Sequence, residues 1–199
     1  ASFFDATESE DTTWPYAIDP RLTMDENRLV AGVRPANQRI FDTSVQHAEM
    51  HGMGTTVVAL FYSTTKERVF IAHVGDSRIY LLRDGGIRQL TEDHSIVGLL
   101  VRNGEITPQE AANHPAKGRL SRFAGMEADV PAATKTIEVQ PGDRLLLCTD
   151  GLYNMVDEKE MQVTTMRVAE LRTVVEFLAE AAFKRGGFDN ISLVVVAHD

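Results

Sequence analysis

Seven short β-branched or apolar runs, separated by turn residues, constrain the fold of this chain more than any other feature. They span 55–62, 68–74, 78–82, 87–90, 134–139, 143–148 and 191–197. The first two are joined by a polar segment, and the next two flank Asp84-Gly85-Gly86, which is a strong hairpin signal. Pro141-Gly142 marks another turn between the fifth and sixth runs. Short connections favour antiparallel pairing, so the first four runs are predicted to form an antiparallel sheet.

Helical periodicity lies on both sides of these runs. Apolar residues return every third or fourth position from 24 to about 47, where Pro35 predicts a kink or a division into two helices. A strongly amphipathic helix is predicted over 167–184, ended by Gly186-Gly187. The segment before residue 20 is acidic and turn-rich, which predicts a loop from Asp5 to Pro20.

A mostly helical insertion separates the fourth run from the fifth. Residues 96–101 are apolar, and Gly104 is a predicted helix end. Thr107, Pro108 and Glu110 then form the pattern of an N-cap, a first-turn proline and a capping box. The complete order of elements predicts an α+β fold in which antiparallel sheets are covered by helices.

Composition narrows the class of protein. The 199 residues include 20 Lys and Arg against 29 Asp and Glu, giving a net charge of -9, which argues against nucleic acid and anionic membranes as partners. Cys148 is the single cysteine, so an intrachain disulfide scaffold is excluded. No apolar run approaches the length of a membrane span, and the first residues lack a signal-peptide layout. These features predict one cytoplasmic domain over 1–199.

The candidate chemistry lies in acidic residues at strand ends. Asp76 follows the second run, Asp93 the fourth and Asp150 the sixth, while Asp189 precedes the last. Carboxylates that converge at the rim of a sheet are ligands for a hard cation such as Mg²⁺ or Mn²⁺. Each aspartate taken singly also has an ordinary explanation in a turn or a helix cap.

Other catalytic arrangements have weaker support. A cysteine phosphatase needs an arginine that closes a short phosphate loop, and Thr-Asp-Gly-Leu-Tyr-Asn after Cys148 contains none. The serines and histidines form no triad visible in the sequence, although distant residues could still meet in space. Gly52-Met53-Gly54-Thr55-Thr56 lacks the lysine and the following helix of a phosphate-binding loop.

Seven short motifs, taken together, resemble the metal-dependent type 2C serine/threonine protein phosphatases, the PPM family, in its bacterial form. In chain order they are Met53-Gly54-Thr55-Thr56, His73-Val74-Gly75-Asp76-Ser77-Arg78, Leu90-Thr91-Glu92-Asp93-His94-Ser95, Gly104-Glu105-Ile106-Thr107-Pro108-Gln109-Glu110-Ala111, His114-Pro115, Cys148-Thr149-Asp150-Gly151-Leu152 and Gly187-Phe188-Asp189-Asn190-Ile191. Each motif is weak alone, but their order and spacing from Met53 to the C-terminus are specific.

The resemblance implies a sandwich of two antiparallel sheets flanked by helices, with metal ions at one end. It implies hydrolysis of phosphoserine and phosphothreonine by metal-activated water, with two catalytic Mg²⁺ or Mn²⁺ ions and a possible third. Asp150 and Asp189 match ligands of the catalytic pair, and Asp93 matches a ligand of the third ion, with Asp150 shared. Gly75-Asp76-Ser77-Arg78 matches a motif interpreted as structural. The segment 102–126 matches the family's variable flap, and phosphorylated proteins, including serine/threonine kinases and their substrates, are the implied partners.

The chain departs from the family pattern at its front. Family members carry an Arg, an Asn-Glu-Asp-type motif and an Asp-Gly-Met-Gly-Gly motif before the first long helix, and none of these precedes it here. His51-Gly52-Met53-Gly54 is no substitute, because it aligns with the later Gly-Thr-Thr motif. We therefore expect the chain to be the C-terminal portion of a larger phosphatase, with two strands absent and sheet edges exposed. A binding module without catalysis (a pseudophosphatase) and a hydrolase of small phosphoesters are the alternatives.

Overall fold

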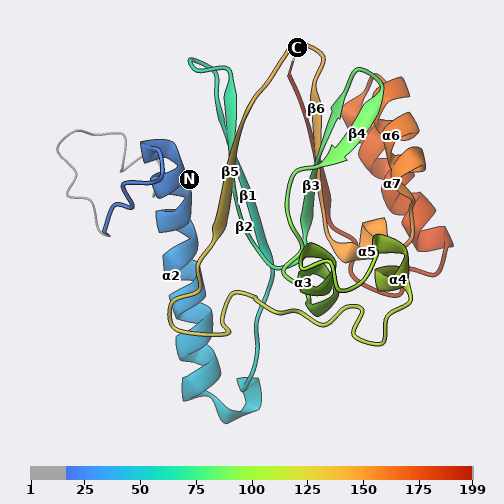
Figure 1. The fold of residues 1–199 in the computed structure, drawn as a ribbon. Coiled ribbons are helices and arrows are strands. Elements are labelled where there is room, and N and C mark those ends of the chain that lie inside the picture. The colour runs from blue at the N-terminus through green and yellow to red at the C-terminus, as the bar shows by residue number, and fades with distance from the viewer. Residues whose placement is uncertain (1–16, 199) are drawn as a thin grey trace.

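Two antiparallel sheets packed face to face form the centre of the molecule (Figure 1). The computed structural model describes residues 17–198. One sheet has the order β1-β2-β5, with strands β1 (Val57–Ser63), β2 (Arg68–Val74) and β5 (Ala133–Glu138). The other has the order β4-β3-β6-β7, with strands β3 (Arg78–Arg83), β4 (Gly86–Gln89), β6 (Arg144–Cys148) and β7 (Leu193–Ala197). The predicted α+β sandwich of two antiparallel sheets is confirmed.

Helices cover both outer faces of this sandwich (Figure 1). α2 (Met24–Gln46) packs on the three-stranded sheet and is followed by the short 3₁₀ helix η1 (Ala48–Met50), whereas α6 (Glu158–Arg167) and α7 (Leu171–Lys184) pack on the four-stranded sheet. Three short helices gather at one end of the sandwich: α3 (Ile96–Arg102), α4 (Pro108–Ala112) and α5 (Asp150–Tyr153). None of the helices described here is long and apolar enough to cross a membrane.

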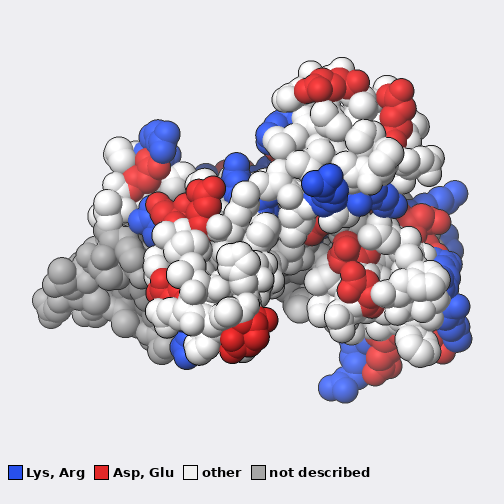
Figure 2. Space-filling model, turned by 90° about the horizontal axis from the view of Figure 1, so that it is seen from below, with Lys and Arg blue, Asp and Glu red and all other residues white. Residues whose placement is uncertain are grey.

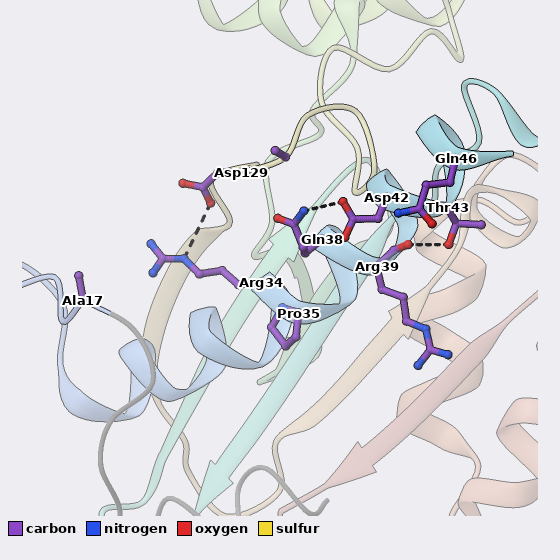
Figure 3. Close-up of a pocket in the computed structure, with 10 residues that line it drawn as sticks. Ala17, Arg34, Pro35, Gln38, Arg39, Asp42, Thr43, Gln46 and Asp129 are labelled. Atoms are coloured by element: carbon purple, nitrogen blue, oxygen red, sulfur yellow. Dashed lines mark hydrogen bonds and ion pairs between the residues drawn. The ribbon is translucent and has the colours of Figure 1, made fainter. Parts of the chain in front are cut away.

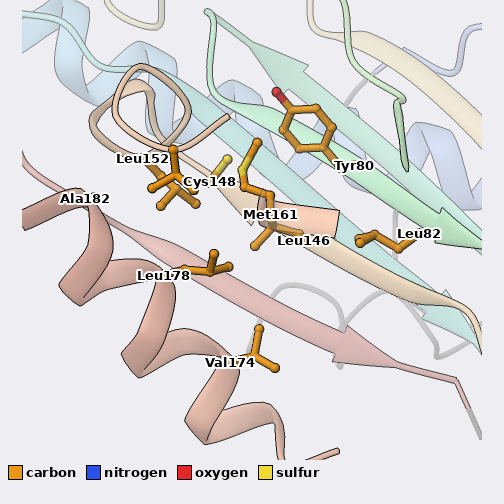
Figure 4. Packing of buried hydrophobic residues seen from close by; sticks show 10 residues of the cluster. Tyr80, Leu82, Leu146, Cys148, Leu152, Met161, Val174, Leu178 and Ala182 are labelled. Atoms are coloured by element: carbon orange, nitrogen blue, oxygen red, sulfur yellow. The ribbon is translucent and has the colours of Figure 1, made fainter. Parts of the chain in front are cut away.

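The central strand β3 shows why the layers hold together. Ile79 and Leu81 belong to the cluster between the two sheets, while Tyr80 and Leu82 belong to the cluster beneath α6 and α7. All four are buried, because side chains alternate between the two faces of a strand and both faces are covered. Figure 4 shows the second cluster, in which side chains of β3 and β6 approach Leu178 and its neighbours on α7. Each such side chain contributes about 1.5–3 kcal/mol through burial.

The first four strands do not share one sheet, which corrects the prediction from their spacing. The chain leaves the first sheet after β2 and enters the second at β3, through Gly75-Asp76-Ser77. Gly75 has a φ of 107°, and a Cβ there would lie 2.4 Å from Cγ2 of Thr56. The Ser77 hydroxyl is hydrogen-bonded to that of Thr56 at 2.8 Å, which ties the crossing to the residue just before β1. The crossing therefore depends on a glycine and places Asp76 at the end of the sandwich.

Two helical predictions need comment. Of the two alternatives predicted at Pro35, a kink or a division into two helices, the division is wrong, because α2 runs through Pro35 as one helix of 23 residues. Leu29 and Val33 pack on the sheet, and the Asn37 amide donates to the carbonyl oxygens of Glu127 and Ala128 at 3.0 Å.

The helix predicted over 167–184 begins at Leu171, and the sequence analysis missed α5 and α6. The capping box at Thr107 and Glu110 is confirmed. Of the predicted loop from Asp5 to Pro20, residues 17–20 are described and contain no helix or strand, while the rest lies outside the described residues.

Candidate metal centre

The loops after β6 and before β7 bring Asp150 and Asp189 to the same end of the sandwich. β6 and β7 are adjacent antiparallel strands, so the end of one lies beside the start of the other. The Thr149 hydroxyl donates to the Asn190 carbonyl at 3.1 Å and accepts from the Ser192 N–H at 3.1 Å. A Cβ on Gly151 would lie 2.3 Å from the Asn190 carbonyl oxygen. The two loops therefore touch through their backbones, and only glycine at position 151 permits this contact.

The carboxylates at this end repel one another. Burial, together with the charge of Asp189, raises the pKa of Asp150. Burial and the charges of Asp150 and Asp93 raise the pKa of Asp76 to about 6. A hydrogen bond from its own backbone N–H and the charge of Arg78 act in the opposite direction. A cation bound beside Asp150 would reduce this repulsion between carboxylates.

Asp93 reaches the same region, but its carboxylate is already engaged. Nε of Arg78 donates to Oδ1 at 3.0 Å, and Nη2 of Arg78 donates to Oδ2 at 2.7 Å. The Gln89 amide donates to Oδ1 at 2.9 Å. This two-point arginine contact is strong and fixes orientation. The structure thus brings all four predicted aspartates to one end of the sandwich.

Arg78 is the centre of a network beneath the carboxylates. It donates to the Tyr80 hydroxyl at 2.9 Å, and its guanidinium lies 3.7 Å from the centre of the Tyr153 ring. The Tyr153 hydroxyl in turn donates to the Asp76 carbonyl at 3.1 Å. Burial opposes the charge, but the ion pair with Asp93 keeps the pKa of Arg78 above its ordinary value.

The sequence analysis assigned one structural role to Gly75-Asp76-Ser77-Arg78 and did not identify Tyr153. The structure separates these residues: Gly75, Ser77 and Arg78 hold the crossing and the floor of the site, while Asp76 faces the cavity. Tyr153 could have been found from its position three residues after Asp150, since residues three apart lie on one face of a helix.

A cavity of about 910 Å³ opens above this network. Its lining includes Asp76, Arg78, Asp93 and Asp150, together with residues of α3 and α4 and Met155. Asp189, which is exposed, lies outside this lining. Figure 2 looks at this end of the molecule from below and shows basic and acidic side chains mixed around a central hollow. Asp76, Asp93 and Asp150 are half-buried and line the cavity, so part of each residue is accessible from it.

A second cavity, of about 850 Å³, lies along α2 and has a different character (Figure 3). Gln38 donates to Asp42 at 2.8 Å, and Arg34 pairs with Asp129 at 3.9 Å. Its carboxylates are thus engaged by neighbours, and it shares no residue with the first cavity. The candidate metal centre is therefore in the cavity beside Asp150.

The donor set fits a hard divalent cation only in part. Among residues 17–198, no group of three or more His, Cys, Asp or Glu side chains is arranged to hold a metal ion alone. Mg²⁺, however, is commonly bound by one or two carboxylates together with waters and substrate phosphate oxygens. Asp150 interacts electrostatically with both Asp189 and Asp76, and these residues supply carboxylates of that kind.

Comparisons with known proteins agree with this arrangement. The family model described as "Protein phosphatase 2C" matches residues 6–185. A serine/threonine phosphatase, stp, from Listeria monocytogenes is 41% identical over 174 residues, which cover 87% of this chain and 68% of the relative. The crystal structure of the serine/threonine phosphatase PstP from Mycobacterium tuberculosis has a TM-score of 0.81 and 35% identity, covering 90% of this chain and 76% of that one. A structure of the catalytic domain of PstP with two manganese ions has a TM-score of 0.75, with 32% identity, and covers 97% of this chain and 77% of that one.

The chain therefore belongs to the protein phosphatase 2C family, the metal-dependent serine/threonine protein phosphatases. This result confirms the family identified from the seven motifs and the phosphoric monoester hydrolase class that they implied.

Proposed function

We propose that Asp150 and Asp189 are metal ligands of a phosphatase centre that hydrolyses phosphoserine and phosphothreonine on proteins. The backbone contact between Gly151 and Asn190 carries this proposal, because it holds the two carboxylate-bearing loops together. When bound, two Mg²⁺ or Mn²⁺ ions supply positive charge against the phosphate and lower the pKa of the attacking water. The protein positions the two carboxylates and presents an open cavity to the phosphorylated side chain.

Asp93 is the residue that we propose to share a third ion with Asp150. Its carboxylate accepts from Arg78 and Gln89, and these bonds fix its orientation while leaving lone pairs for a cation. Asp76 lines the same cavity and is a further carboxylate near Asp150. The third ion itself, and the flap-like role of 102–126 beside the cavity, remain predictions.

Phosphorylated proteins are the substrates that membership of this family implies, and serine/threonine kinases and their targets are the partners we infer.

A cytoplasmic location is part of the same proposal. The single Cys148 is buried, and burial raises its pKa to about 12, so it contributes no disulfide chemistry. Cell fractionation with an antibody against the chain would test the location.

The metal proposal is tested first by measuring Mn²⁺ binding. Bound Mn²⁺ is detected as a decrease in the electron paramagnetic resonance signal of free Mn²⁺. The wild type should bind Mn²⁺, while Asp150→Asn and Asp189→Asn should each weaken binding at least tenfold, because each removes a charged ligand. Asp84→Asn is the matched control, since Asp84 is exposed in the β3–β4 turn with a φ of 51°, which Asn also adopts. Unchanged binding in both site variants would refute the assignment.

Hydrolysis separates the enzyme from the alternatives. The full-length protein should hydrolyse p-nitrophenyl phosphate with Mn²⁺, and excess EDTA should abolish the turnover. Mn²⁺ binding without turnover of any phosphorylated substrate would instead support a pseudophosphatase. A panel that compares phosphopeptides with small phosphoesters would separate the protein phosphatase from a hydrolase of small phosphoesters.

A further inference from the structure

The cavity beside Asp150 has an apolar side as well as an acidic one. We define the apolar wall by the residues that α3, α4 and the turn after α5 contribute to the lining, namely Val97, Val101, Pro108, Ala111, Ala112 and Met155. The carboxylates of Asp76 and Asp150 line the same continuous cavity. A ligand whose phosphate lies at the acidic side therefore has an apolar surface directly beside it.

The size of the cavity indicates that more than a phosphoryl group enters it. Its volume of about 910 Å³ is near the upper end for cavities that enclose a whole small ligand, a range of about 300–1,000 Å³. A phosphorylated side chain fills only a fraction of that space. The remainder is available to a neighbouring part of the substrate.

The apolar wall is partly exposed: Val97, Val101, Ala111 and Met155 are half-buried, and Pro108 and Ala112 are exposed. α3 has the sequence Ile-Val-Gly-Leu-Leu-Val-Arg, yet none of its residues is buried, and none in α4 is buried either. Val97 and Val101 keep part of their apolar surface exposed, and both line the cavity. The Ile96 N–H donates to the Arg119 carbonyl at 2.8 Å, which joins the start of α3 to the segment after α4. Covering Val97 and Val101 with an apolar side chain would therefore be favourable.

Positive charge at the edge of the cavity identifies the kind of ligand. Lys117 and Arg102 line the cavity and are exposed. Arg102 has one weak ion pair, with Glu92 at 3.4 Å, and no ion pair of the Lys117 ammonium is found in residues 17–198. Two cations beside an apolar surface suit a phosphorylated polypeptide, which brings negative charge and ordinary side chains together.

We propose that the apolar wall binds the side chain next to the phosphorylated residue, so that this protein prefers phosphosites flanked by a large apolar residue. The inference rests on the proposed phosphatase function and adds a substrate preference to it. Val101 and Met155 are the specificity-determining residues, because both line the cavity, Val101 from α3 and Met155 from the turn after α5.

The test uses binding, so that it does not depend on turnover. Two fluorescent peptides carry a phosphonate analogue of phosphothreonine, whose C–P bond resists hydrolysis, and differ only in Leu or Asn at the adjacent position. Their affinities are measured with Mn²⁺ by fluorescence anisotropy for the wild type, for Val101→Asn and for Val163→Asn. Val163 is the matched control, because it is 38% exposed on α6 and does not line the cavity. The ¹³C-methyl NMR signal of Met155 is identified by its disappearance in Met155→Leu. A change in its chemical shift shows that a peptide contacts the apolar wall.

The wild type should bind the Leu peptide about tenfold more tightly than the Asn peptide, as expected for burial of one apolar side chain. Val101→Asn should reduce that ratio to less than about twofold, whereas Val163→Asn should preserve it. The Met155 methyl signal should shift with the Leu peptide. Equal affinities in the wild type, or an undiminished ratio in Val101→Asn, would overturn the inference. Peptides without the phosphonate separate the two proposals. Equal affinity with and without the phosphonate would refute the phosphatase function. The ratio of the affinities for the Leu and Asn peptides tests the apolar wall independently.

Discussion

The contact between Gly151 and Asn190 offers the sharpest perturbation of the candidate metal centre. Gly151→Ala adds one methyl group at a point 2.3 Å from the Asn190 carbonyl oxygen and 2.9 Å from its carbonyl carbon. Both atoms are backbone, so no side chain can rotate away to make room. The substitution therefore has to move the loop that carries Asp189 away from the one that carries Asp150.

The size of the movement follows from the distances. An ordinary carbon–oxygen contact is at about 3.4 Å or more, so the loops must separate by about 1 Å. Overpacking of this kind costs about 1–3 kcal/mol, which a domain with about 5–15 kcal/mol of stability survives. A displacement of about 1 Å in a catalytic constellation reduces activity by about 100-fold. We expect the variant to fold, to bind Mn²⁺ weakly and to lose about 100-fold in metal-dependent turnover.

The assay pairs thermal unfolding with Mn²⁺ titration. Gly142→Ala is the control, because Gly142 has a φ of 89° and open space around its Cβ position, in the β5–β6 turn. Alanine is strained there and lowers stability by about 1 kcal/mol or more, without any contact with the carboxylate loops. The two variants should lose comparable stability, and only Gly151→Ala should lose metal affinity. Wild-type Mn²⁺ affinity in a folded Gly151→Ala would refute the reasoning.

Three further predictions follow from other contacts. Arg78→Lys should lower the melting temperature and the turnover, because lysine lacks the planar fork with which Arg78 contacts both oxygens of Asp93 and the Tyr80 hydroxyl. An unchanged melting temperature would contradict the network. Burial raises the pKa of Asp143, but hydrogen bonds from Arg83 outweigh it and lower the pKa below its ordinary value of 3.8. The stabilisation from this pair is therefore present above pH 3.8 and is lost as the pH falls below that value. Urea unfolding from about pH 6 to about pH 3 should therefore show a smaller loss for Asp143→Asn than for the wild type. Cys148, with its pKa raised to about 12, should react with a thiol reagent only after unfolding, and rapid reaction in the native state would show that β6 opens readily.

Local signals account for the parts of the fold that the sequence predicted well. The second strand lies over 68–74 as expected, and the β3–β4 turn is marked by positive φ values at Asp84 and Gly85. Thr107 caps α4 through the predicted capping box. These features depend on residues a few positions apart, so the pattern alone determines them.

Features that depend on distant residues were not predictable in the same way. The division of the first four strands between two sheets depends on the fit of Gly75 against Thr56. α6 was missed because only Met161 and Thr165 are buried along its ten residues, which leaves a weak apolar period. The order of the carboxylates along the chain could not show that Arg78 takes Asp93 and leaves Asp76 facing the cavity.

The absence of buried residues in α3 and α4 separates two kinds of evolutionary change in this molecule. Substitutions at exposed and half-exposed positions ordinarily change stability by less than about 0.5 kcal/mol, whereas changes in the clusters around β3 and β6 cost several times more. The wall of the cavity can therefore diversify among descendants of this chain while the sandwich that positions the carboxylates is inherited unchanged.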